Sequence, residues 1–206
     1  MQPIIHPTYF PTVAHWVVIN NAEGKLVLEK EDNYQKQTYR NRAYIYSPNG
    51  IQMLSIPIKH TKSKGHRKYK DVILEDSFDW KKQHWKSLQT AYRTSPFFEF
   101  YEDELAPFFE KKHRFLYDMN LESMELMSEC LQLELDLTPT QSYETQISDY
   151  ADMRFLVNAK SGKKYDFTPY TQVFGDKHGF IENLSGLDLL FNEGTNALSY
   201  LEEQGF

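Results

Sequence analysis

The chain has 206 residues, of which 40% are hydrophobic and 25% are charged, the composition of an ordinary globular protein. No apolar run approaches the roughly 18 residues of a membrane-spanning helix, and the first residues lack the basic and apolar stretches of a signal peptide. The single cysteine, Cys130, excludes an internal disulfide and a cysteine-based zinc cluster. We therefore expect a cytoplasmic protein of one domain without a metal site.

The net charge of −6 is unevenly distributed. Residues 1–95 hold 15 Lys/Arg and 8 Asp/Glu, whereas residues 96–206 hold 8 and 21. The basic half favours an anionic or phosphate-bearing small molecule as partner, and the acidic total argues against binding to nucleic acid.

The first predicted elements surround a turn at residues 6–12. Ile4 and Ile5 indicate a short strand, and two prolines in the turn stop any regular element from running through it. Thr12 is the expected N-cap of a helix that ends at residues 21–24. A strand that turns abruptly into a helix points backbone N–H groups at the space above the strand end, a usual place for an anionic or nucleotide ligand.

This turn carries the candidate catalytic residues His6, Tyr9 and His15. Either histidine would act as a general base or a phosphate contact, because the ordinary histidine pKa is close to neutral pH. In the first helical turn, the helix dipole should lower the pKa of a partly exposed His15 below about 6.5. The alternative interpretation makes Tyr9 a core aromatic residue and both histidines structural.

A second strand is predicted at residues 25–29, followed by a polar stretch at residues 33–42. Arg40 and Arg42 can hold a carboxylate or phosphate through paired N–H groups, and Asn41 offers both a donor and an acceptor. These three are candidate substrate-binding residues, and a solvated loop is the alternative.

Asn49-Gly50 between apolar runs predicts a hairpin of strands at residues 43–46 and 51–58. The following segment, residues 59–70, holds six Lys/Arg and two His. We predict that it forms a lid over a phosphate-bearing ligand, with a solvated loop as the alternative. A short strand is expected at residues 72–74.

Helical periodicity begins after Asp79 and predicts a helix to residue 92, in which His84 is structural, as is His113 further on. Ser95 and Pro96 are expected to start the next helix, Pro107 to interrupt it, and Asn120 to cap the last helix of this region. Cys130 falls on the apolar side of that last helix and indicates a core position.

The C-terminal third begins with a predicted strand at residues 135–140. Asn183 or Ser185 is expected to cap a helix that Asn192 and Gly194 end, and a final helix covers residues 195–203. Together these elements predict an α/β fold with a mixed β-sheet formed mainly by residues 1–75, a helical layer from residues 77–133, and a C-terminal segment, residues 134–206, that returns to the sheet.

Several sequence blocks, in order over nearly the whole chain, resemble the WbqC-like family of bacterial proteins. The blocks are Pro7-Thr8-Tyr9-Phe10-Pro11, Tyr39-Arg40-Asn41-Arg42, Ser55-Ile56-Pro57-Ile58, Ser95-Pro96-Phe97-Phe98 and Tyr170-Thr171-Gln172. The fourth block also includes Trp85 to Tyr92, which precede Ser95. The fifth block also includes Phe180 and residues 183–194.

The resemblance implies an enzyme of surface-polysaccharide or O-antigen biosynthesis, a transferase or amide-forming enzyme that moves a small acyl or aminoacyl group from an activated donor to an amine. A non-catalytic binding or scaffold protein of a polysaccharide gene cluster is the alternative. The same blocks add Gln172, Asn183 and Asp188 as substrate-binding candidates, with Asp188 orienting an amine or binding backbone N–H groups at the helix start. They also imply that Tyr9, Arg40, Arg42 and Gln172 line one cleft.

A second likeness concerns Thr12-Val13-Ala14-His15, which resembles the [HT]-x-G-H element of nucleotidylyltransferases and adenylating ligases. In those enzymes the histidine contacts nucleotide phosphate, and Ala14 stands here in place of the glycine that allows close approach. The expected cofactor or co-substrate is accordingly a nucleotide or an activated acyl donor. The oligomeric state is left open.

Overall fold

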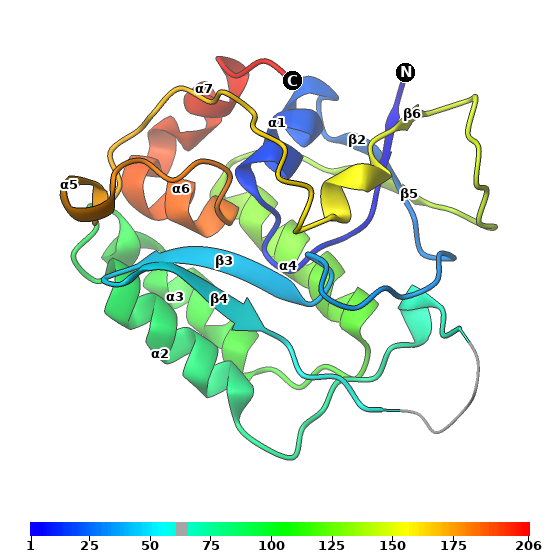
Figure 1. Ribbon diagram of the computed structural model, residues 1–206, viewed down its shortest axis with the longest axis horizontal. Helices are drawn as coiled ribbons and strands as arrows, with labels where there is room; N and C mark the ends of the chain where they lie inside the picture. Colours follow the sequence, from blue (N-terminus) through cyan, green and yellow to red (C-terminus); the bar gives the residue numbers. More distant parts are fainter. Residues whose placement is uncertain (61–65) are drawn as a thin grey trace.

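A computed structural model describes residues 1–60 and 66–206. Its first organising unit is a parallel sheet of four short strands, β1 (Pro3–Ile5), β2 (Lys25–Leu28), β5 (Asp136–Pro139) and β6 (Ala151–Asp152), in the order β5-β2-β1-β6. Ile4 on the central strand β1 pairs with Val27 on one side and with Asp152 on the other. Figure 1 shows this sheet at one side of the molecule.

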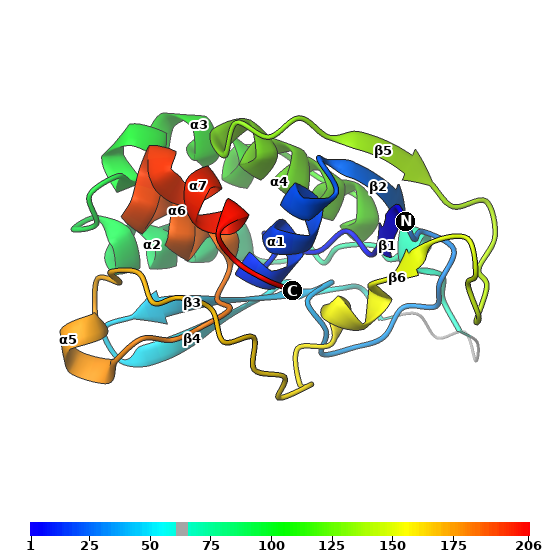
Figure 2. The ribbon, with the colours of Figure 1, turned by 90° about the horizontal axis from the view of Figure 1, so that it is seen from above.

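A separate antiparallel hairpin is formed by β3 (Arg42–Ser47) and β4 (Gly50–Ser55). The turn at Pro48 and Asn49 lies where the Asn-Gly signal predicts it. The turn end of this hairpin lies beside α5 (Gly175–His178), on the side of the molecule opposite the parallel sheet (Figures 1 and 2). The α/β fold is thus confirmed, and its parallel and antiparallel strands belong to two separate sheets.

The helices between and after the strands supply most of the core. Among the described residues, no helix combines the length and the apolar character that crossing a membrane requires. The α-helices besides α5 are α1 (Val13–Asn21), α2 (Trp80–Tyr92), α3 (Phe98–Glu110), α4 (Leu116–Cys130), α6 (Gly186–Glu193) and α7 (Ala197–Glu202), and the short 3₁₀ turns are η1 (Tyr69–Asp71), η2 (Arg154–Val157) and η3 (Gly194–Asn196).

Several predicted helix ends are confirmed because their signals are local. Thr12 is the N-cap of α1, Asp79 accepts a hydrogen bond from the backbone N–H of Lys82 at the start of α2, and Ser185 caps α6 by accepting from Leu187. Gly194 ends α6 with a positive φ of 55°, a conformation that glycine adopts without a steric penalty.

Three predicted helix boundaries in residues 95–120 are wrong. Ser95 instead closes the turn after α2, its hydroxyl donating to the carbonyl of Tyr92 at 2.6 Å, and α3 begins only after Phe97. Pro107 lies inside α3, where buried packing of the neighbouring Phe108 and Phe109 holds the helix together. Asn120 is buried in the middle of α4 instead of capping it, so tertiary packing overrides the local preference.

Residues 134–206 return to the sheet, because both β5 and β6 come from this segment and flank β2 and β1, which come from the N-terminal part of the chain. The predicted strand at residues 72–74 is reduced to isolated pairs, Leu74 with Ile58 and Ile73 with Phe115. The result is a molecule in which four strands that are far apart in the sequence end side by side.

Candidate functional site

All four strands of the parallel sheet run in the same direction, so their carboxyl ends meet at one edge. His6 directly follows β1, Glu29 follows β2, Thr140 follows β5, and Arg154 comes two residues after β6. In open α/β sheets, ligands bind outside this carboxyl edge, at the place where the strand order reverses. Here the order reverses between β1 and β6, next to His6 and Arg154.

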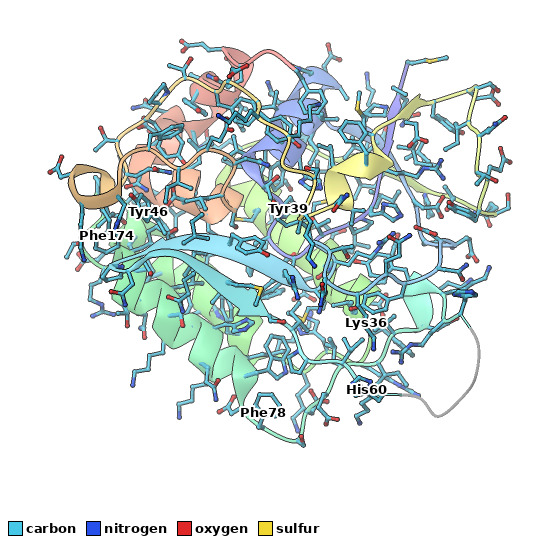
Figure 3. The ribbon with its side chains drawn as sticks, in the orientation of Figure 1. Lys36, Tyr39, Tyr46, His60, Phe78 and Phe174 are labelled. Carbon is cyan, nitrogen blue, oxygen red and sulfur yellow. The ribbon has the colours of Figure 1, made fainter. Side chains whose placement is uncertain are left out.

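A pocket of about 580 Å³ opens at that place. Its charged lining carries more positive than negative groups, unlike the chain as a whole. Lys36, labelled in Figure 3, comes from the segment between β2 and β3. The charged and ionisable lining residues are His6, Asp32, Lys36, Arg40, Tyr143, Asp152, Arg154 and Lys160.

The floor of the pocket is a buried cluster of His6, Asp32 and Arg40. The Nη2 of Arg40 donates to Oδ2 of Asp32 at 2.6 Å, and Nε2 of His6 lies 2.9 Å from the same oxygen. Nη2 of Arg40 also lies 2.7 Å from Nε2 of His6, so Nε2 can either carry a proton and donate it to Asp32, or accept from Arg40 while Nδ1 carries the proton. Nδ1 of His6 has no hydrogen-bond partner among the described residues in either case.

Burial lowers the pKa of His6 to about 4, with Asp32 opposing the shift and Arg40 reinforcing it. His6 is therefore neutral at neutral pH and able to accept a proton. The pKa of Asp32 lies below its ordinary value, even though burial opposes this, because His6 and Arg40 both favour the carboxylate.

Arg40 is the least expected member of this cluster, because its side chain is fully buried. Its guanidinium lies over the ring of Tyr69 at 5.3 Å, and its Nε and Nη1 have no hydrogen-bond partner within the described residues. The buried guanidinium therefore has N–H groups on Nε and Nη1 that could each donate a single hydrogen bond to an anion such as a carboxylate or phosphate.

The opposite wall is built around Arg154 at the start of η2. Its Nε and Nη2 bind the two carboxylate oxygens of Asp152 at 2.8 and 2.7 Å, and its Nη1 donates to the carbonyl of Glu144 at 2.7 Å. Nη1 also lies 3.7 Å from Oε2 of Glu29. Arg154 therefore joins the ends of β6 and β2 and fixes the segment before β6.

The start of α1 does not provide the ligand site that the strand-turn-helix pattern predicts. The backbone N–H of Val13 donates to the carbonyl of Leu184 at 3.0 Å, and that of Ala14 donates to the side chain of Asn183 at 2.9 Å. The segment before α6 thus satisfies these donors inside the protein, and Asn183 has a capping role for a helix 169 residues earlier.

Tyr9 and His15, predicted to be catalytic, are both buried away from the pocket lining. The hydroxyl of Tyr9 lies 3.0 Å from Nδ1 of His84, and Nδ1 of His15 lies 2.8 Å from the hydroxyl of Thr12. The pKa of His15 is lowered to about 3, first by burial and then by His6. The direction is the expected one, but burial is its main cause, and the expected partial exposure is wrong because His15 is 1% exposed.

Among the predicted substrate-binding residues, Asn41 and Arg42 also lie outside the pocket lining. The amide of Asn41 contacts the carbonyl of Ile56 at 3.4 Å, and Arg42 begins β3, where it pairs with Ser55. Of the four residues predicted to share one cleft, only Arg40 lines this pocket.

Gln172 and Asp188 belong to a second polar cluster, and neither lines the pocket. Both carboxylate oxygens of Asp188, which is fully buried, are used: Tyr92 donates to one at 2.8 Å, and Tyr170 and Gln172 donate to the other at 2.6 and 2.8 Å. Burial raises the pKa of Asp188, and these three donors oppose the shift. The helix-start N–H groups predicted as its partners are not among these donors.

The basic segment at residues 59–70 is only partly described, because residues 61–65 lie outside the described part of the chain. Its Lys68 and Lys70 form ion pairs with Glu31 at 2.6 and 2.5 Å, and these bonds lower the pKa of Glu31 to about 2. These two lysines therefore bind within the protein, and no described residue of the segment lines the pocket.

Comparison with known proteins places these residues in context. The family model described as "WbqC-like protein family" matches residues 6–165, more than half of the chain. The chain belongs to the WbqC-like protein family. This WbqC-like protein is similar to "Uncharacterized protein Rv1507c" of Mycobacterium tuberculosis, with 25% identity over 227 residues and 96% of each chain covered. No solved structure matches it.

The residues of the pocket that sequence reasoning missed all lie within the family match. Asp32 and Arg154 carry no motif, and Arg154 lies in a stretch without a clear period. Gln172, Asn183 and Asp188 lie beyond the matched residues.

Proposed function

We propose that this WbqC-like protein is an enzyme that binds an anionic, phosphate-bearing or carboxylate-bearing donor in the pocket at the carboxyl edge of its parallel sheet. The observation that carries the proposal is the buried Arg40 guanidinium, whose Nε and Nη1 have no partner within the described residues. A buried polar group without a partner costs free energy that a ligand can recover.

The charges around Arg40 favour an anion. Lys36, Arg154 and Lys160 line the same pocket, against two carboxylates that are already paired with His6, Arg40 or Arg154. A pocket lined by one predominant sign of charge raises the local concentration of an oppositely charged ligand. A phosphate or carboxylate is therefore attracted to the pocket, whose lining includes Arg40.

His6 supplies the group that could act on a second substrate. Its Nδ1 has no partner among the described residues, and the tautomer with the proton on Nε2 leaves Nδ1 able to accept a proton. An anion bound beside His6 would raise its pKa from the low value set by burial. We therefore assign to His6 the role of general base. An amine attacks the carbonyl carbon of the donor, the bond to the phosphate or other leaving group breaks, and the amine proton passes to Nδ1.

The sequence resemblance to WbqC-like proteins supports transfer of a small acyl or aminoacyl group in surface-polysaccharide synthesis as the finer form of this proposal. The adenylating alternative has less support, because Thr12 and His15 are buried and neither lines the pocket. A non-catalytic binding protein would keep the anion site but show no turnover.

The test is titration of the protein with inorganic pyrophosphate by calorimetry. The double variant Lys36→Gln, Lys160→Gln removes two charges from the pocket wall. The matched control Lys82→Gln, Lys86→Gln removes two exposed charges from α2. We expect the pocket variant to weaken binding about tenfold and the control less than twofold. Equal binding by both variants, or none by the natural protein at millimolar pyrophosphate, contradicts the proposal.

Turnover is tested with acetyl phosphate and acetyl-coenzyme A as donors and a set of amino sugars as acceptors. His6→Gln keeps a hydrogen-bonding side chain but cannot take up the proton. We expect it to bind pyrophosphate within about threefold of the natural protein while losing at least 100-fold in rate. Retained pyrophosphate binding without turnover of any pair supports the binding-protein alternative.

A further inference from the structure

A second cavity, of about 350 Å³, lies against one face of the same parallel sheet. Ile4, Val27 and Thr138, which line it, are register partners on β1, β2 and β5, and register partners in a sheet point to the same face. Residues of the segment 141–150, which loops out between β5 and β6 (Figure 1), complete the lining. The cavity therefore has an apolar floor and a loop as its roof.

The charge of this second cavity is opposite to that of the first. Its lining includes Glu29, Glu144 and Asp149, and none of its described residues is Lys, Arg or His. Apolar lining comes from Pro139, Ile147 and Tyr150 in addition to the sheet residues. A cavity with carboxylates and apolar walls, but without a cation, fits a small organic cation with a short apolar body.

Glu29 gives this cavity a specific binding group. Its Oε1 accepts hydrogen bonds from the backbone N–H groups of Glu31 and Asp32, at 2.7 and 3.1 Å, and from the hydroxyl of Thr140 at 3.0 Å. Its Oε2 has no hydrogen-bond partner among the described residues, although the residue is 1% exposed. A buried carboxylate oxygen without a donor calls for one.

Arg154 does not donate a hydrogen bond to Oε2 of Glu29. Its Nη1 lies 3.7 Å from Oε2 of Glu29, beyond hydrogen-bond distance, and the same nitrogen already donates to the carbonyl of Glu144. The carboxylate of Glu29 thus keeps a free acceptor site. Since Glu29 lines the second cavity and Arg154 lines the first, this pair connects the linings of the two cavities.

We propose that the second cavity binds a protonated primary amine, with Oε2 of Glu29 as the acceptor for its ammonium group and Glu144 and Asp149 as the outer charges. The identity of this amine as the acceptor substrate rests on the proposed function, but the binding of an ammonium group does not. The two cavities would then hold an anionic donor and a cationic acceptor on either side of the Glu29–Arg154 pair.

The test compares n-butylammonium chloride with n-butanol as its neutral control. Binding of each probe is measured by the backbone amide NMR shifts of residues 138–150. We expect butylammonium to shift these amides with an affinity at least about tenfold higher than that of butanol, because only the cation meets the carboxylates. Equal affinity for the two probes, or cation-specific shifts that spare these residues, overturns the proposal.

Variants then locate the ammonium group. Glu29→Gln keeps one oxygen for the three donors on Oε1 and should weaken butylammonium binding at least about tenfold. The pair Glu144→Gln, Asp149→Asn changes exposed side chains only and should weaken binding several-fold, compared with the equally exposed control pair Glu99→Gln, Asp103→Asn on α3. If Glu29→Gln fails to fold, the exposed pair decides, and binding equal to that of its control refutes the proposal.

Pyrophosphate separates this inference from the proposed function. Butylammonium binding with no pyrophosphate binding leaves the ammonium site standing and removes the anionic donor. Pyrophosphate binding with no preference for butylammonium over butanol supports the anion site of the proposed function and refutes the ammonium site. The Glu144→Gln, Asp149→Asn pair should leave pyrophosphate affinity within about threefold, because neither residue lines the first pocket.

Discussion

The side-chain amide of Asn120 donates a hydrogen bond of 2.6 Å to the backbone carbonyl of Arg40. The same amide nitrogen also contacts the hydroxyl of Tyr69, whose ring lies beneath the Arg40 guanidinium. Asn120 on α4 does not line the pocket, but it holds in place both the backbone of Arg40 and the Tyr69 ring against which the Arg40 guanidinium packs.

Asn120→Ala should destabilise the protein by about 1–3 kcal/mol, because it leaves a buried carbonyl without a partner. Urea unfolding measures this against Glu129→Ala, an exposed change on the same helix. Pyrophosphate affinity should fall several-fold in Asn120→Ala and stay unchanged in the control. Unaltered stability and affinity would show that Arg40 is held in place without Asn120.

Asp188→Ala should cost about 3 kcal/mol or more of folding free energy, because Tyr92, Tyr170 and Gln172 all donate to this buried carboxylate. In the fraction that remains folded at low temperature, pyrophosphate affinity should be within about twofold of the natural value, since Asp188 does not line the pocket. Calorimetric titration checks this. Loss of pyrophosphate binding in a variant of normal stability would show that Asp188 contributes to the binding site.

Stability should fall in weak acid before most carboxylates titrate. Burial lowers the pKa of His6 and His84 to about 4 and that of His15 to about 3. Between these values and about 6.5, the unfolded chain binds protons that the folded protein excludes. Their contribution is therefore complete above about pH 6.5 and is lost as the pH falls towards 4.

Each of these histidines should contribute about 1.4 kcal/mol per pH unit in that window. The measurement is urea unfolding at several pH values between 7 and 5. His15→Gln should reduce the slope of unfolding free energy against pH by about one proton. A slope identical to that of the natural protein would mean that His15 is protonated in the folded state.

Gly24→Ala should destabilise the protein far more than Gly162→Ala. Both glycines have a positive φ, 74° and 63°, so both substitutions carry the same kind of backbone strain. A Cβ at residue 24 would lie 1.8 Å from the carbonyl oxygen of Glu134, whereas a Cβ at residue 162 would have open space.

We therefore expect about 1 kcal/mol for Gly162→Ala and at least about 3 kcal/mol for Gly24→Ala, since the latter separates β2 from the chain that leads into β5. Thermal unfolding compares the two. Similar losses would mean that the backbone near Glu134 moves away at little cost.

The parts of the fold that the sequence predicts are those with short-range causes. The Asn-Gly hairpin, the start of α1 after Thr12 and the end of α6 at Gly194 depend on neighbouring residues, and all three are present. Asn120 shows the limit of such reasoning. A capping preference is a local property, but its amide is used by groups 80 and 51 residues away, and no local pattern reports that.

The candidate site was less predictable for the same reason. Arg40 stood out as an arginine in a polar stretch, which normally indicates an exposed residue, and only the fold buries it against His6 and Asp32. β6 has two residues and no periodicity, so neither Asp152 nor Arg154 could be placed next to β1 from the sequence. Spatial proximity at a parallel sheet edge depends on strand order, which the pattern of side chains does not encode.

The strand order also decides when the pocket can exist. Ile4 pairs with Asp152 and Val27 with Thr138, so the central strands gain their outer neighbours only after most of the chain is available. Contacts of such long sequence separation slow folding. During synthesis, the four-stranded sheet and the pocket cannot be completed until β6 and Arg154 have left the ribosome. A nascent chain paused before that point would expose the apolar edge of β1, and the charged floor of the pocket would lack its second wall.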